Sequence, residues 1–143
     1  MIRFLQVNTA KNIPNVKAAA ELKNGQPVAY NPAEGTVAAA TGKCAYLVKA
    51  AETYNGMDAV RMPSDGAYEK IAAGAICHLV PAYVGEHYAT TELTVGSLSA
   101  GDRVAADGGK FVANGSGEWI YVGEYADPTG LTMHEIIYSP IAE

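Results

Sequence analysis

Short apolar runs separated by glycine-rich turns extend over most of the chain. In the stretch 98–123 the apolar residues gather in three runs, at 102–106, 110–113 and 118–122. Asp107-Gly108 and Asn114-Gly115 lie between these runs, and both dipeptides tolerate the positive φ angles of tight hairpin turns. The pattern predicts a three-stranded antiparallel meander.

A second meander of the same design is predicted upstream, with runs at 27–30, 36–40 and 43–50. Several of its positions match the first meander at a nearly constant spacing. Leu22, Gly25 and Val28 stand 76 residues before Leu98, Gly101 and Val104, and Val37, Gly42, Tyr46 and Leu47 stand 75 before Val112, Gly117, Tyr121 and Val122. This agreement predicts an internal duplication, and the alternative is that any meander needs glycine at its turns.

One short motif, apolar-x-x-Gly-x-x-apolar, opens both meanders and is called the lead-in motif below. It occurs at Leu22-Gly25-Val28 and Leu98-Gly101-Val104, and again at Ile71-Gly74-Cys77. Glycine allows a turn that other residues resist, so we expect each motif to deliver the chain into a strand. The first inward side chain of that strand should lie three residues after the glycine.

Further strands are predicted at 2–7, 58–62, 76–83, 88–95 and 131–138. About ten short strands at this spacing indicate a mainly β protein, a small antiparallel barrel or sandwich built from meanders. At most one short helix is expected, at Val16–Leu22 with Asn15 as its cap, although the same run also suits a strand. We expect residues 1–15 to form an N-terminal arm or first strand and residues 16–143 a single β domain.

Charge and hydropathy exclude two classes of partner. The net charge is −5 and the basic residues are scattered, whereas a nucleic-acid-binding protein needs a basic surface. The longest uncharged stretch, 71–85, is shorter than the roughly 20 residues of a membrane span. No secretory signal is recognised near the N-terminus, so we expect a protein that binds neither nucleic acid nor membrane.

The residue types that carry catalysis or bind metals are dispersed. His78, His87 and His134 lack the close spacing of metal motifs. Cys44 and Cys77 lie in apolar runs and are expected to be buried free thiols. The acidic residues near the turns, Asp102, Asp107 and Glu118, suit a solvated face better than an acid-base pair. We therefore expect a protein that is not an enzyme and holds no metal or cofactor.

The aromatic residues favour an interface. The chain has nine tyrosines and two phenylalanines, and tyrosine is enriched where proteins meet. Charged residues make up 17% of the chain, below the roughly 25% usual for soluble domains. These features suggest a surface that contacts protein, and Tyr54 and Tyr88 are candidates for it. The alternatives are that the tyrosines fill the rim of the β core and that small residues, Ala, Gly and Thr, take the place of charged ones.

The stretch Leu98–Gly123 also resembles a known family. Its phrasing, Leu98-Ser-Ala-Gly101-Asp102-Arg-Val104, then Gly109-Lys110-Phe111, then Trp119-Ile-Tyr-Val122-Gly123, is similar to that of the head-decoration, or capsid cement, proteins of tailed bacteriophages. The resemblance implies a β-rich protein on the outer capsid surface of a virion, made in the host cytoplasm. It also implies the major capsid protein as partner, stabilised contacts between capsid subunits, and self-association, with a trimer favoured. The middle portion 51–95 departs from the phrasing.

The N-terminal residues complete this hypothesis. A strand at Met1–Asn8 could add to the edge of a capsid sheet through backbone hydrogen bonds, and we expect the capsid contact at Ile2, Phe4, Leu5 and Val7. Two alternatives remain open. One is another virion component of the tail-tube or fibre-base type. The other is a small ligand-binding β-barrel lined by Tyr83, His87 and His134.

Overall fold

In a computed structural model the described residues are 2–6, 13–50, 70–128 and 130–141. Within these ranges the chain forms β-strands and no helix, and no helix capable of crossing a membrane is found there. The strands are β1 (Ile2–Gln6), β2 (Ile13–Ala18), β3 (Leu22–Lys23), β4 (Val28–Asn31), β5 (Thr36–Ala39), β6 (Tyr46–Ala50), β7 (Lys70–Ile71), β8 (Ile76–Pro81), β9 (His87–Thr90), β10 (Arg103–Asp107), β11 (Lys110–Ala113), β12 (Trp119–Ala126) and β13 (Thr132–Tyr138).

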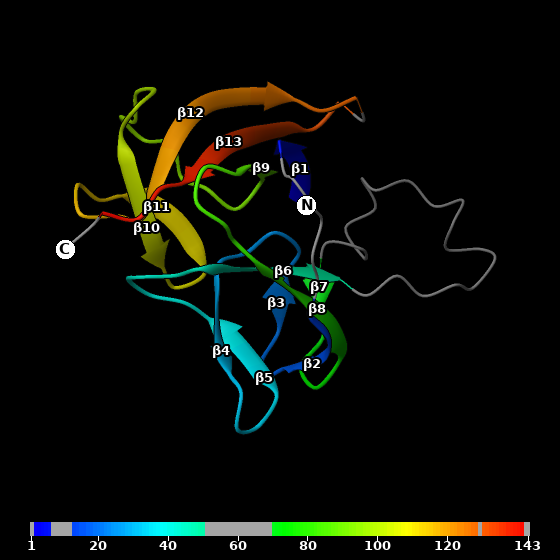
Figure 1. Cartoon of the computed structure of the whole chain (residues 1–143). Coiled ribbons are helices and arrows are strands. Elements are labelled where there is room, and N and C mark those ends of the chain that lie inside the picture. The colour runs from blue at the N-terminus through cyan, green and yellow to red at the C-terminus, as the bar shows by residue number, and fades with distance from the viewer. Residues whose placement is uncertain (1, 7–12, 51–69, 129, 142–143) are drawn as a thin grey trace.

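Most of the described strands lie in two larger sheets, as Figure 1 shows. One has the strand order β1-β9-β13-β12-β10-β11 and the other the order β4-β5-β2-β8-β6, while β3 and β7 form a short separate pair. The sheets do not close into a barrel, and the arrangement is consistent with a sandwich. The predicted mainly β fold is therefore confirmed.

The predicted order within each meander is wrong in the same way. In the stretch 98–123 the second and third strands do not pair, because β12 lies beside β10 instead of β11. In the upstream stretch β4 and β5 form a hairpin, but β6 pairs with β8. The third strand of each stretch therefore does not lie beside the second strand of its hairpin. β12 pairs with the first strand of its hairpin, β10, and β6 pairs with β8.

The two halves of the chain repeat one arrangement, which agrees with the predicted duplication. The first half is β2, β4, β5, β6 and β8, and the second half is β9 to β13. In the first half, the second strand of the hairpin β4-β5 is parallel to β2, β2 pairs with β8, and β8 pairs with β6. In the second half, the second strand of the hairpin β10-β11 is parallel to the segment 92–94 that follows β9, β9 pairs with β13, and β13 pairs with β12.

The lead-in motif forms the same turn at four places. In each turn a backbone N–H donates to the carbonyl oxygen three residues earlier, and the glycine at the third position has φ between 79° and 97°, as in a type II turn. The glycine N–H then donates to a neighbouring strand, whose own N–H donates back to the residue after the glycine. The glycines and their cross-strand partners are Gly25 with Val48, Gly74 with Ala18, Gly85 with Tyr138 and Gly101 with Tyr121.

Three of these turns lie at the predicted motifs, and the fourth, at Gly85, was not predicted. Three residues after each glycine the side chain is buried, as the motif predicts: Val28, Cys77, Tyr88 and Val104 are at most 1% exposed. The fourth copy reads Ala82-x-x-Gly85-x-x-Tyr88, in which alanine stands where the other copies have a larger aliphatic residue.

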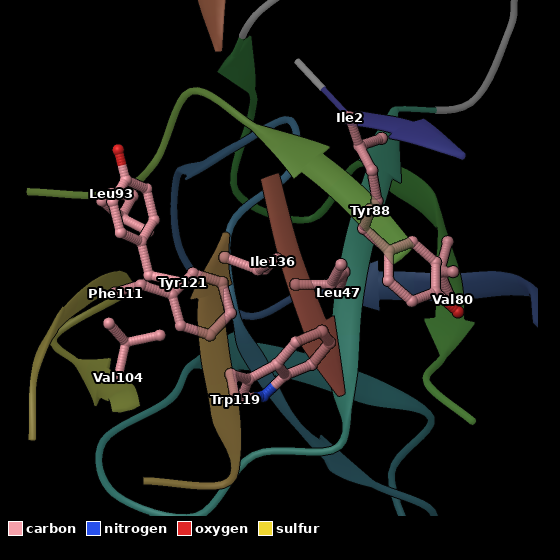
Figure 2. Packing of buried hydrophobic residues seen from close by; sticks show 10 residues of the cluster. All are labelled: Ile2, Leu47, Val80, Tyr88, Leu93, Val104, Phe111, Trp119, Tyr121 and Ile136. Atoms are coloured by element: carbon pink, nitrogen blue, oxygen red, sulfur yellow. The ribbon is translucent and has the colours of Figure 1, made fainter. Parts of the chain in front are cut away.

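Each half has its own core, and the first half contributes to both. The larger cluster gathers ten buried side chains, shown in Figure 2: Ile2, Leu47, Val80, Tyr88, Leu93, Val104, Phe111, Trp119, Tyr121 and Ile136. Because successive strand residues point to opposite faces, Leu47 and Val80 enter this second-half core while their neighbours Val48 and Leu79 enter the first-half core. The first-half sheet is thus packed on both faces along β6 and β8.

The N-terminal segment is a strand of the second-half sheet. Residues Ile2–Gln6 pair antiparallel with β9, and Ile2 is 6% exposed in the larger core. The helix considered at Val16–Leu22 does not form, because Val16 and Ala18 are buried strand residues of β2. Asn15 is not a helix cap but sits at φ 63°, where the pairing of β2 with β8 shifts register.

Candidate functional site

The residues expected at the capsid contact are dispersed in the structure. Ile2 and Tyr88 are core residues, 6% and 1% exposed, so their side chains are not available at the surface. Leu5 is half-buried and packs on the small cluster of Ala89 and Met133. The backbone of Phe4 lies opposite Tyr88 in the pairing of β1 with β9. Two further candidates, Val7 and Tyr54, lie outside the described residues.

Tyr88 instead supports the turn that precedes it. Its hydroxyl donates a 2.5 Å hydrogen bond to the carboxylate of Glu86, a residue that is 8% exposed. Burial, and then this carboxylate, raise the pKa of the Tyr88 phenol above its usual value, so the hydroxyl stays a donor. Glu86 closes the Gly85 turn, since its N–H donates to the carbonyl of Tyr83. A core tyrosine therefore fixes the shape of a surface turn.

That turn carries the largest exposed apolar residues of the repeated turns. Tyr83 is 44% exposed and Val84 is 73% exposed. The corresponding pairs in the other turns are small or polar: Lys23-Asn24, Ala72-Ala73 and Ser99-Ala100. The same backbone geometry thus forms without large apolar side chains, and the turn requires a particular residue only at its glycine position. The turn Tyr83–Glu86 is therefore a candidate interaction surface, here called the apolar turn.

The histidines do not converge on one site. His87 and His134 lie opposite Ile137 and Thr90, three positions apart along the pairing of β9 with β13, so alternation places them on opposite faces. The Nδ1 atom of His87 lies 2.7 Å from the Glu135 carboxylate. Burial lowers the pKa of His134, whose Nδ1 has no hydrogen-bond partner. Tyr83, His87 and His134 therefore do not line one ligand pocket.

The described residues contain no cluster of three or more histidine, cysteine or acidic side chains that could hold a metal ion. Both cysteines are buried free thiols, as predicted. The thiol of Cys44 donates to the carbonyls of Val28 and Tyr46 at 3.3 and 3.0 Å, and burial raises its pKa to about 11. A thiol held neutral and inside the protein acts as a packing group.

The three acidic residues near the turns lie apart and have separate structural contacts. Asp102 accepts a 2.8 Å hydrogen bond from the N–H of Ser99 and so closes its own lead-in turn. Glu118 accepts one of 3.2 Å from the N–H of Cys44, in the other half of the chain. Asp107 is exposed at the end of β10. No acid-base pair is formed among them.

The two halves meet where the turn between β10 and β11, residues 107–110, reaches the first half. The N–H of Gly109 donates to the carbonyl of Ala40 at 3.1 Å, and the N–H of Gly108 donates to the Thr41 hydroxyl at 3.1 Å. Gly109 lies so close to Gln26 that an added Cβ would fall 1.6 Å from its side-chain nitrogen. The turn is therefore seated on the first half, and this contact was not predicted from the sequence.

An open depression of about 330 Å³ lies on the second half. Its lining residues are Leu98, Asp102, Arg103, Ala113, Asn114 and Gly115. The Arg103 guanidinium donates through one nitrogen to the carbonyls of Gly117 and Ser139, at 3.0 and 2.7 Å. These bonds hold the cation at the wall of the depression.

Comparison of the chain with models of protein families, with curated proteins and with solved structures found no match.

Proposed function

We propose that this chain is a non-enzymatic structural protein of a phage virion. In this proposal it binds the outer surface of the assembled capsid, contacts the major capsid protein and stabilises the contacts between capsid subunits. The resemblance of Leu98–Gly123 to capsid cement proteins suggests the partner. The observation that carries the proposal is the apolar turn, where Tyr83 and Val84 are exposed on a backbone that three other turns build without them.

The apolar turn has the properties of a binding anchor. Exposed apolar area that folding does not require is a mark of an interaction site, and aromatic anchors supply much of the binding energy at interfaces. The Tyr88–Glu86 hydrogen bond holds the turn in one shape, so little conformational freedom is lost when a partner covers it. Repetition over a capsid surface would add avidity to a modest single contact.

The outer edge of β1 offers a second contact to the same partner. This strand ends its sheet, where it pairs with β9 on one side, and an edge strand can receive a further strand through backbone hydrogen bonds. The contact would then use the backbone of residues 2–6, because the Ile2 side chain belongs to the core.

Binding to purified capsids that lack this protein tests the proposal. Val84→Asp places a charge at the exposed second position of the apolar turn, and Ala73→Asp places the same charge at the matching position of the Gly74 turn. We expect Val84→Asp to weaken capsid binding about tenfold or more, as for an anchor residue, and Ala73→Asp to bind like the unmodified protein. Absence of binding by the unmodified protein, or equal binding by both variants, would contradict the proposal.

Deletion of residues 1–8 is a poor substitute for this test. It removes β1 and the buried Ile2, so a loss of binding would follow from damage to the fold as readily as from loss of a contact. Surface substitutions avoid that ambiguity.

A further inference from the structure

The depression on the second half corresponds, residue by residue, to the place on the first half where the β10-β11 turn is seated. The hairpin registers give one part of the match, because Val28 pairs with Ala39 as Val104 pairs with Ala113. The next residues repeat one hydrogen bond. The N–H of Ala40 donates to the carbonyl of Pro27 at 3.1 Å, and that of Asn114 to the carbonyl of Arg103 at 2.9 Å.

The turn beneath the depression matches as well. In the first half the Gln26 side chain accepts a hydrogen bond from the N–H of Lys23 at 2.7 Å. In the second half the Asp102 side chain accepts one from the N–H of Ser99 at 2.8 Å. The lining of the depression therefore corresponds in order to Leu22, Gln26, Pro27, Ala39, Ala40 and Thr41.

On the first half this surface is a seat for a hairpin tip. Four of its residues contact the β10-β11 turn: Gln26 and Ala39 border Gly109, Ala40 accepts its N–H, and Thr41 accepts that of Gly108. The corresponding surface on the second half remains an open depression among the described residues. One copy of a repeated seat is thus filled and the other is vacant.

The chain also carries the matching unseated tip. By the same registers the β4-β5 tip, residues 31–36, corresponds to the β10-β11 turn at 107–110. Residues 31–34 are exposed, and a Cβ added at Gly35 would meet nothing within 4 Å. The tip is two residues longer than its counterpart, which suits an open depression. It carries the exposed carboxylate of Glu34, and both Asp102 and Arg103 line the depression.

From this vacant seat and this unseated tip we infer that a second copy of the chain places its β4-β5 tip in the depression at Leu98, Asp102, Arg103 and Ala113–Gly115. This contact between two molecules has the same form as the contact that joins the two halves within one molecule. It is heterologous, head to tail, because tip and seat are different surfaces, and such contacts build rings when the rotation closes. The inference is independent of capsid binding.

Sedimentation velocity of the full chain tests the inference. Unmodified protein is expected to associate as its concentration rises. Ala113→Trp fills the depression from an exposed position and should weaken association about tenfold or more. Ala73→Trp, at an exposed position on the Gly74 turn, is the matched control and should associate normally. Circular dichroism confirms that each variant is folded.

Mixing identifies the head-to-tail geometry. Ala33→Trp enlarges the tip and leaves the depression intact, whereas Ala113→Trp blocks the depression and leaves the tip intact. At a concentration where each variant alone is monomeric, their mixture should form dimers and nothing larger, because one working tip meets one working seat. An isologous contact would not give this complementation.

A charge exchange separates this contact from general surface effects. Ala113→Glu places a carboxylate in the depression opposite Glu34 and should weaken association. Adding Glu34→Lys should restore it, whereas Glu21→Lys, an exposed charge on another segment, should not. The inference is overturned if unmodified protein stays monomeric at every concentration, if Ala113→Trp associates like unmodified protein, or if Glu34→Lys fails to restore association.

Discussion

The Nε1–H of Trp119 donates a 2.8 Å hydrogen bond to the backbone carbonyl of Cys44, which lies 75 residues earlier in the other half of the chain. The indole is fully buried, with Phe111, Tyr88 and Tyr138 around it at ring-centroid distances of 4.9 to 6.0 Å. The N–H of Cys44 in turn donates to the Glu118 carboxylate. Both backbone groups of Cys44, in the first half, are therefore hydrogen-bonded to residues of the second half, Glu118 and Trp119.

Trp119→Phe should test the importance of this link. The substitution keeps an aromatic ring in the core but leaves the buried Cys44 carbonyl without its partner, which costs about 1–3 kcal/mol of unfolding free energy. Tyr138→Phe, on the ring that packs against Trp119, is the control and should change stability by about 0.5 kcal/mol or less. Urea unfolding followed by circular dichroism measures both, since Trp119 is the only tryptophan. Equal stability of the two variants would contradict the argument.

Two glycines of one turn should respond oppositely to alanine. A Cβ added at Gly117 would lie 2.0 Å from the backbone oxygen of Val104, whereas one added at Gly115 would meet nothing within 4 Å. Gly117→Ala should therefore destabilise the protein by about 3 kcal/mol or more, as expected when the backbone itself must shift. Gly115→Ala should be neutral or stabilising by up to about 1 kcal/mol. Thermal unfolding of both variants under one condition checks the contrast.

This contrast also shows a feature of the fold that the sequence pattern does not predict. Asn114–Gly117 has the composition of a tight hairpin tip, yet Gly117 lies against Val104 because the chain crosses the end of β10 there. Several strands were predicted well, since the run at 110–113 coincides with β11 and the pattern of buried positions after each lead-in glycine is local. The strand predicted at 58–62 lies outside the described residues. Strand order depends on contacts between distant residues, which alternation alone does not encode.

The duplication was predicted with a partly wrong alignment for a related reason. A spacing of 75 matches Tyr46 with Tyr121, but the hydrogen bonds of the lead-in turns match Val48 with Tyr121, a spacing of 73. The two hairpins have tips of different length, so the offset shifts from the turns to the later strands. The match between the depression and its counterpart seat depends on this register, which the spacing of residues in the sequence does not give.

Stability should fall at alkaline pH because of Cys44. Burial raises the pKa of its thiol from 9.0 to about 11 in the folded protein, so the neutral form is favoured there. Between these values the unfolded chain loses this proton first, and the stabilisation present below pH 9 is lost as the pH rises towards 11. The free energy of unfolding should fall by about 2 kcal/mol over this pH range. Unfolding free energies measured under reducing conditions from pH 8 to 11 should fall less steeply for Cys44→Ala, and parallel curves would contradict this origin.

Ile2→Ala distinguishes a docked first strand from a free arm. The Ile2 side chain is 6% exposed in the larger core, and the backbone of β1 pairs with β9. Truncation of a buried isoleucine to alanine costs about 2–5 kcal/mol, so the variant should lose a stability of this order, measurable by urea unfolding at neutral pH. Ile141→Ala, at a position 51% exposed near the other end of the chain, should change stability by about 0.5 kcal/mol or less. If Ile2→Ala were as stable as Ile141→Ala, the N-terminal residues would be an arm whose apolar side chains remain free for a partner.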